Sequence, residues 1–156
     1  MKPDLGMSDR ERKEVAGELV YFLADTYSLY LKSQNFHWNL KGQTFYPSHK
    51  LLEEHYEDLA DAADEIAERV AALGHYVPAS FTAFKKLSQI EEENKKISYK
   101  EMFRRLVKGH ELIAKKYRPH IVEFQKLHDE ISADLLIKRL AIHEKAAWML
   151  QSSVTG

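Results

Sequence analysis

The sequence of 156 residues contains no cysteine. Disulfide bonds, thiolate metal sites and cysteine nucleophiles are therefore excluded as sources of stability or chemistry. Neither sign of charge dominates, because 23 Lys and Arg residues oppose 24 Asp and Glu residues for a formal net charge of −1. This balance does not favour a protein that binds nucleic acid through a global positive charge.

The sequence also lacks any apolar run near the length needed to cross a bilayer. The segment Met1 to Glu14 is polar and has no apolar stretch of the kind found in a signal peptide. Together with the absence of cysteine, this leads us to expect a cytoplasmic location and no membrane partner. The length suits one domain over residues 1–156, with a flexible N-terminal tail at 1–7 and a short C-terminal tail at 152–156.

Glycine and proline are scarce, at six and four residues, which leaves room for long helices. Apolar residues recur at helical spacing, and Ser8 with Glu11 and Ser98 with Glu101 have the spacing of capping boxes. Gly74 is suited to a helix C-cap and Pro119 is expected to kink its helix. The expected helices run from about Ser8 to Asn39, Pro47 to Leu73, Ser98 to Leu127 and Asp129 to Ser152, with a short helix near Phe81 to Ile90. The predicted fold class is all-α, a ferritin-like four-helix bundle with a short extra helix in the long crossover.

The expected second helix carries two distinct faces. A stripe of four ligand-type side chains, His49, Glu53, Asp64 and Glu68, falls within an arc of roughly 100° when the helix is wound at 3.6 residues per turn. Its centre lies about 140° from the apolar face, so the stripe points away from its own bundle core. The apolar face consists of Leu52, Tyr56, Leu59, Ala63, Ile66 and Val70.

The stripe consists of two pairs with i,i+4 spacing, and each pair can place two ligands near one ion. Glu53 and Asp64 are about 16 Å apart along the helix axis, whereas a metal–oxygen bond is only about 2.0–2.6 Å long. One chain therefore cannot use both pairs on one ion. Two antiparallel copies of the helix, crossing near Asp58, would bring His49 and Glu53 of one chain to Asp64 and Glu68 of the other. This arrangement predicts a two-fold dimer with two identical sites.

Imidazole and carboxylate ligands suit iron, and also manganese or zinc. Eight acids and no Lys or Arg lie between Glu53 and Glu68, and a bound cation would relieve their mutual repulsion. The alternative is a solvated acidic face without a ligand.

The segment Lys32 to Gly74 resembles the Dps family, the mini-ferritins of starved bacteria. The similar strings are KSQNFHWNLKG and HKLLEEHYEDLADAADEIAERVAALG, with ADLL and HEKAAWML in the last helix. The likeness extends from about Leu19 to Leu150. It implies a hollow dodecamer that oxidises Fe²⁺ with hydrogen peroxide and stores the Fe³⁺ mineral, with no organic cofactor. Bacterioferritins and ferritins are less similar, because their Glu-x-x-His ligands point into the bundle core.

Carried over by position, the resemblance implies that His37 joins His49, Glu53, Asp64 and Glu68 as ferroxidase ligands, with Trp38 beside the site. Glu53 stands where many relatives have Asp, a departure that keeps the charge. The resemblance also implies acidic pores for iron entry, and Asp129, Glu130 and Asp134 are candidates to line them. Helix capping is the alternative role for Asp129.

Two rival functions remain. Some relatives bind DNA through lysine-rich tails, but the N-terminal segment mixes basic and acidic residues and the tail 151–156 has no basic residue. We therefore expect weak or absent DNA binding, since such binding depends on phosphate neutralisation. The other rival is a structural bundle that keeps the assembly without iron chemistry. Among the remaining histidines, we expect His55 and His143 to pack, and His110 shows no usable pattern.

Overall fold

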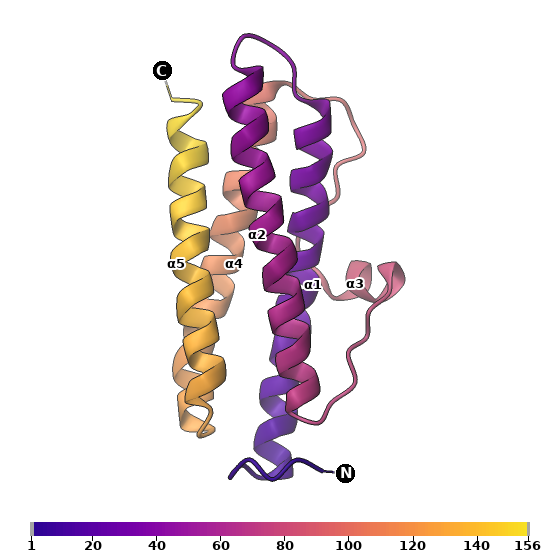
Figure 1. Ribbon diagram of the computed structural model, residues 1–156, viewed down its shortest axis with the longest axis vertical. Helices are drawn as coiled ribbons and strands as arrows, with labels where there is room; N and C mark the ends of the chain where they lie inside the picture. The colour runs from indigo at the N-terminus through magenta and orange to yellow at the C-terminus, as the bar shows by residue number, and fades with distance from the viewer. Residues whose placement is uncertain (1, 156) are drawn as a thin grey trace.

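A computed structural model describes residues 2–155 of the chain, and Figure 1 shows its four long helices side by side with one short helix beside them. The helices are α1 Asp9–Asn39, α2 Phe45–Ala72, α3 Phe81–Leu87, α4 Tyr99–Lys126 and α5 Glu130–Ser152. No strand occurs among the described residues. The predicted all-α class is therefore confirmed, with four long helices and a short extra helix in the crossover.

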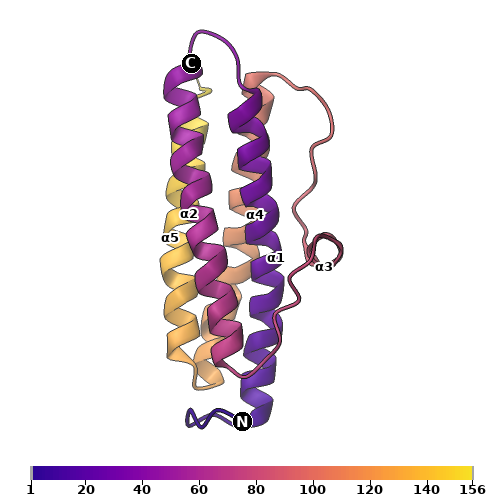
Figure 2. The same ribbon diagram turned by 45° about the vertical axis from the view of Figure 1, so that its right-hand side comes forward.

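The connections fix how the helices run. A short loop joins α1 to α2 and a tight turn joins α4 to α5, so each of these pairs is antiparallel (Figure 1). The crossover from α2 to α4 returns along the outside of α1 and carries α3 there, as both views show (Figures 1 and 2). The C-terminal end of α1 consequently lies beside the N-terminal end of α2, which is where both candidate histidines lie.

The helix ends follow local sequence signals in most places. Ser8 caps α1 in a reciprocal capping box with Glu11, and Gly74 adopts a φ of +85° directly after α2. Ser98 caps α4, but the Glu101 carboxylate accepts from Arg105 instead of completing a capping box.

The start of α2 differs from the prediction. The helix begins at Phe45, after Thr44, which makes no side-chain capping bond, so Pro47 is the third helical residue and not the first. Proline is tolerated there because the N–H groups of the first helical turn have no partner within the helix. Helix α4 continues through Pro119, so the predicted kink there stays a prediction.

The core is formed by the apolar faces of all four long helices. Leu52, Leu59, Ile66 and Val70 of α2 are at most 1% exposed, as the helical wheel predicts. Helix α5 likewise buries an apolar face, formed by Leu135, Leu136, Leu140, Ala147 and Leu150. Because α2 buries this face against its own bundle, its acidic stripe is left on the opposite side.

The crossover is held to the bundle by a buried carboxylate. Asp25 of α1 is 0% exposed and accepts hydrogen bonds from Ser88 Oγ at 3.0 Å and the Gln89 main-chain N–H at 2.7 Å. It also accepts from Lys116 Nζ at 2.8 Å and the Tyr117 hydroxyl at 2.7 Å, both on α4. One side chain thus joins α1, α4 and the crossover.

Both chain ends make contacts with the bundle. Met7 packs against the core, and its carbonyl accepts from Arg12 at 2.7 Å. At the other end Val154 packs against the core. Met1 and Gly156, the outer ends of the two expected tails, lie outside the described residues. Within residues 2–155, no helix combines the length and apolar character that crossing a membrane requires.

Candidate metal centre

Two candidate ligands face each other where α1 ends and α2 begins. The imidazole rings of His37 and His49 are stacked, with centroids 3.6 Å apart and an interplanar angle of 15°. His37 Nδ1 lies 2.8 Å from the His49 carbonyl, and His49 Nδ1 lies 3.0 Å from the His37 carbonyl. A carbonyl only accepts, so each Nδ1 carries a hydrogen, and in the neutral form of each ring Nε2 then presents a lone pair. This is the tautomer in which a metal-binding imidazole is normally held.

Glu53 lies one helical turn beyond His49 and is close enough to both imidazoles to interact with them electrostatically. A hydrogen bond from Lys50 Nζ at 2.6 Å, followed by the nearby His37 and His49, holds the pKa of the Glu53 carboxyl below its usual range. The carboxylate is therefore ionised over the physiological pH range. Three of the five predicted ligands therefore lie near one another on one chain, without being arranged to hold a metal ion by themselves.

Aromatic rings surround these ligands. Phe45 stacks on the outer face of His49, with centroids 4.8 Å apart, and Tyr56 meets His37 edge-on at 5.1 Å. Trp38, the tryptophan predicted to lie beside the site, follows His37 directly and is 63% exposed. His37 itself is 6% exposed, so its ring is fixed in place by packing before any ion binds.

The other two predicted ligands are elsewhere on α2. Asp64 and Glu68 are exposed, and neither carboxylate makes an ion pair within the described part of the chain. Among residues 2–155, no three His, Asp or Glu side chains are arranged to hold a metal ion. One chain therefore carries two partial sets of candidate ligands, one where α1 meets the start of α2 and one further along α2, and the described residues contain no complete site.

The middle of α2, between the two partial sets, is fixed to α5. The Asp58 carboxylate accepts two hydrogen bonds from the Arg139 guanidinium, at 3.0 and 2.8 Å. Arg139 is 4% exposed, whereas the Asp58 side chain is 37% exposed, so this bidentate ion pair is shielded from water on the arginine side and open to it on the aspartate side. It holds the middle of α2 against α5.

The predicted pore residues separate into two groups. Asp129 is 2% exposed and caps α5, accepting from the Ser132 main-chain N–H and from Arg69 Nη2. Both of these bonds end on Oδ1, and the Ser132 hydroxyl donates to Oδ2 at 2.6 Å. The capping role is therefore the one observed, because both carboxylate oxygens are already bonded inside the chain. Glu130 and Asp134 are exposed, and Asp134 pairs with Lys138 at 2.7 Å. A pore role stays a prediction for these two.

A buried histidine pair was not predicted as a group. His110 of α4 and His143 of α5 are 2% and 0% exposed, and their Nδ1 atoms lie 2.9 Å apart. Burial lowers the pKa of His110 to about 3, helped by nearby His55 and Arg139, and burial also lowers the pKa of His143. Both rings are neutral near pH 7. Since 33 residues separate them, sequence spacing gave no signal of the contact.

Comparison with known proteins gives consistent results. The family model described as a ferritin-like domain matches residues 17–155. The chain is 37% identical to a low-temperature-induced protein of Nostoc sp. (strain PCC 7120 / SAG 25.82 / UTEX 2576), covering 98% of this chain and 87% of that protein. It is 33% identical to the DNA protection during starvation protein of Helicobacter pylori, covering 86% of this chain and 94% of that protein.

Solved structures agree over almost the full length. The Dps protein of Vibrio cholerae O1, described as a member of a broad superfamily of ferritin-like diiron-carboxylate proteins, superposes with a TM-score of 0.92 at 28% identity. The match covers 99% of this chain and 98% of that one. Antigen TpF1 of Treponema pallidum superposes with a TM-score of 0.89 at 31% identity, covering 99% and 97%.

Proposed function

The chain belongs to the Dps family of ferritin-like proteins, and we propose that it oxidises Fe²⁺ at sites shared between two-fold-related copies of itself. The ligands are His37, His49 and Glu53 of one copy with Asp64 and Glu68 of the other. Iron is the substrate, and hydrogen peroxide is the proposed oxidant. The Fe³⁺ product is stored as mineral inside a hollow dodecamer, which limits oxidative damage in the bacterial cytoplasm.

The observation that carries this proposal is the pair of fixed imidazoles. Each Nδ1 is bonded to a carbonyl, so both Nε2 lone pairs are available without rearranging the loop. Preorganised ligands bind an ion more tightly because their ordering precedes binding. An imidazole is a neutral ligand, and a carboxylate carries one negative charge. Adding the partner's two carboxylates to the two imidazoles and one carboxylate would give a ligand set that favours the higher charge of Fe³⁺ over that of Fe²⁺.

In the proposed reaction, two Fe²⁺ ions each lose one electron, and one hydrogen peroxide accepts both electrons as its O–O bond breaks. The two oxygen atoms leave as water or hydroxide, so no hydroxyl radical forms in the paired reaction. Hydrolysis of Fe³⁺ releases protons, and these protons pass to solvent at the exposed carboxylates. Removing Fe²⁺ and peroxide together protects DNA without contact with it.

Mixing two inactive variants tests the shared site. His37→Ala removes a ligand from one partial set and Glu68→Ala removes a ligand from the other. If sites are shared, a mixed dimer keeps one site with both partial sets intact. Random pairing makes half of the dimers mixed, so co-assembled variants should recover about a quarter of the wild-type sites.

The measurement is anaerobic Fe²⁺ loading followed by peroxide, with ferric absorbance as readout. Each variant alone should be nearly inactive. Mixed chains that recover nothing above the two single variants would show that sites are not shared. Wild-type protein without ferric absorbance above buffer would instead favour the structural-bundle alternative.

DNA binding is the second candidate, because several relatives are named for DNA protection. We propose that direct binding is weak here, since the net charge is −1 and the tail at 151–156 has no basic residue. A gel-shift assay with duplex DNA in low-salt, low-magnesium buffer measures this. Tight retardation would reverse the assignment.

A further inference from the structure

A row of tyrosines leads away from the candidate metal ligands. Tyr56 of α2 meets His37 edge-on with centroids 5.1 Å apart, and Tyr30 of α1 lies 6.2 Å from Tyr56. Tyr27 then lies 5.5 Å from Tyr30. Each step is an edge-to-face contact within the normal range for aromatic pairs, so the rings are in direct contact from one end of the row to the other.

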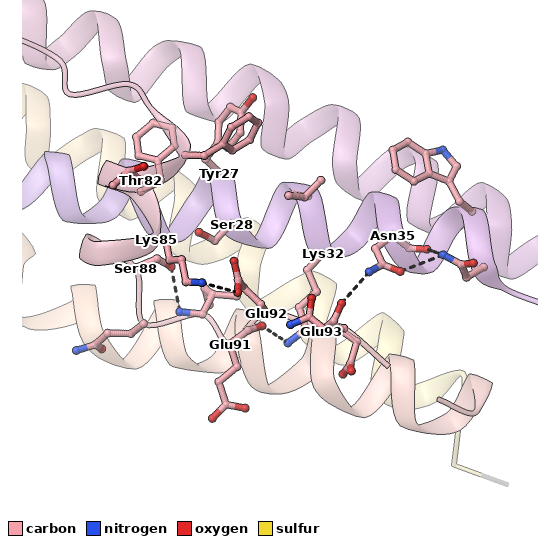
Figure 3. Close-up of a pocket in the computed structure, with 18 residues that line it drawn as sticks. Tyr27, Ser28, Lys32, Asn35, Thr82, Lys85, Ser88, Glu91, Glu92 and Glu93 are labelled. Carbon is pink, nitrogen blue, oxygen red and sulfur yellow. Dashed lines mark hydrogen bonds and ion pairs between the residues drawn. The ribbon is translucent and has the colours of Figure 1, made fainter. Parts of the chain in front are cut away.

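The far end of the row opens into a groove between α1 and the crossover. Tyr27 lines this groove, whose volume is about 850 Å³. Figure 3 shows Tyr27, Ser28, Lys32 and Asn35 along α1 on one side, with residues from Lys85 to Glu93 on the other. The row therefore connects a buried ligand, His37, to a cavity large enough for a small molecule.

The ring contacts of this row do not require the hydroxyl groups. In the described part of the chain, none of the hydroxyls of Tyr27, Tyr30 and Tyr56 donates a hydrogen bond, whereas those of Tyr99 and Tyr117 do. Packing alone would be satisfied by phenylalanine, because the ring provides the contact area. What tyrosine adds is a phenol that is readily oxidised by one electron with loss of its proton.

We infer that Tyr56, Tyr30 and Tyr27 form a relay that carries one-electron oxidising equivalents from the iron site to the groove. This function rests on the proposed ferroxidase activity. It acts when a single Fe²⁺ meets peroxide: iron gives up one electron, the O–O bond breaks, and hydroxide and a hydroxyl radical form. Tyr56 gives that radical one hydrogen atom, which leaves water and a neutral tyrosyl radical.

The radical then moves along the row. Tyr30 transfers one electron to the Tyr56 radical, and the proton that Tyr30 loses is balanced by the proton that Tyr56 takes up, exchanged through solvent at these partly buried rings. The same exchange passes the radical to Tyr27. There a soluble hydrogen-atom donor of the ascorbate class restores the phenol. Moving the radical from one tyrosine to another changes the free energy very little. Reduction of the radical at Tyr27 therefore makes the overall transfer from Tyr56 to Tyr27 favourable.

Tyr30→Phe breaks the row and keeps the ring contacts. Tyr21→Phe is the matched control, because Tyr21 is on the same helix, is 42% exposed and lies outside the row. Each protein is loaded with substoichiometric Fe²⁺, mixed with peroxide without reductant, and analysed by peptide mass spectrometry and freeze-quench electron paramagnetic resonance. Ferric absorbance is recorded in parallel.

We expect wild type and Tyr21→Phe to show oxidised Tyr27, and ascorbate to remove the tyrosyl signal. In Tyr30→Phe, oxidation of Tyr27 should be lost and that of Tyr56 should increase, while the rate of iron oxidation is unchanged. Oxidation of Tyr27 at the wild-type level in Tyr30→Phe would overturn the relay. An equal loss in Tyr21→Phe would also overturn it, because the effect would not depend on the row.

An iron-free measurement separates failure of the relay from failure of the proposed function. The chain has no cysteine, so Glu57→Cys provides one attachment point for a ruthenium photo-oxidant beside Tyr56. Flash oxidation with a sacrificial electron acceptor should oxidise Tyr27, and adding Tyr30→Phe should abolish this. Tyr27 that stays unoxidised with Tyr30 present would reject the relay, whatever the ferroxidase assay shows.

Discussion

His37 and His49 hold each other in place through reciprocal hydrogen bonds, each ring Nδ1 bonding to the main-chain carbonyl of the other residue. Their rings are stacked 3.6 Å apart, so each is both a candidate ligand and the support for the other. Partners that orient a metal-binding imidazole commonly change metal affinity by about 10–100-fold. The two residues should therefore act as a unit.

A double-mutant cycle tests this coupling. His37→Ala and His49→Ala should each weaken Fe²⁺ binding, and the double variant should lose less affinity than the sum of the two single losses, because either change loosens the remaining imidazole. Anaerobic calorimetry on the assembled protein gives the three affinities. Strictly additive losses would show that the two rings bind independently.

Lys50 competes with the metal for Glu53. Its ammonium lies 2.6 Å from the Glu53 carboxylate and is half exposed. Lys50→Gln should therefore tighten Fe²⁺ binding, by less than about fivefold because exposed ion pairs contribute only about 0.2–1 kcal/mol. Lys41→Gln, an exposed lysine before α2, is the control for a simple change in charge. Weaker binding in Lys50→Gln would mean that Lys50 positions the carboxylate instead of blocking it.

The buried histidine pair predicts a loss of stability in acid. The pKa of His110 is lowered from 6.5 to about 3 in the folded chain, so the unfolded chain binds a proton at higher pH than the folded chain does. The free energy of unfolding is therefore unaffected by His110 well above pH 6.5 and falls as the pH drops from 6.5 toward 3, by about 1.4 kcal/mol per pH unit. The lowered pKa of His143 acts in the same direction.

Urea unfolding between pH 4.5 and 7.5 measures this loss. The double variant His110→Leu with His143→Leu should have a shallower pH dependence than wild type, even if its stability at pH 7 differs. His75→Gln is the control, because that histidine is only partly buried and makes no ion pair within residues 2–155. Equal slopes in wild type and the double variant would contradict the assignment of two neutral buried rings.

Asp25 should be the most sensitive position in the crossover. Asp25→Ala leaves Lys116 and Tyr117 without their buried acceptor and frees Ser88 and Gln89, so we expect a loss of about 3–5 kcal/mol in unfolding free energy. Hydrogen exchange at residues 88–92 should rise by more than exchange in α5. Asp61→Ala, at an exposed position of α2, should change stability by no more than about 0.5 kcal/mol. Unchanged exchange at 88–92 would show that other contacts hold the crossover.

Local sequence signals predicted much of the fold. The Ser8 capping box, the positive φ at Gly74 and the buried face of α2 are set by residues within one or two helical turns of each other. The start of α2 was misplaced because Pro47 is compatible with several positions in the first turn, and Thr44 supplies no side-chain cap. The sequence could not decide between a pore role and a capping role for Asp129, because its ion-pair partner Arg69 is 60 residues away.

The sequence by itself determined that the candidate ligands His49 and Glu53 lie too far along α2 from Asp64 and Glu68 to share an ion within one chain, because helical rise and periodicity are local properties of the chain. Only the tertiary structure showed that His37 and His49 fix each other, that His110 meets His143, and that three tyrosines from two helices make one row. These contacts depend on how the helices pack against one another. Packing brings together residues that are far apart in the sequence and follow no regular spacing. No local sequence pattern can therefore predict these contacts.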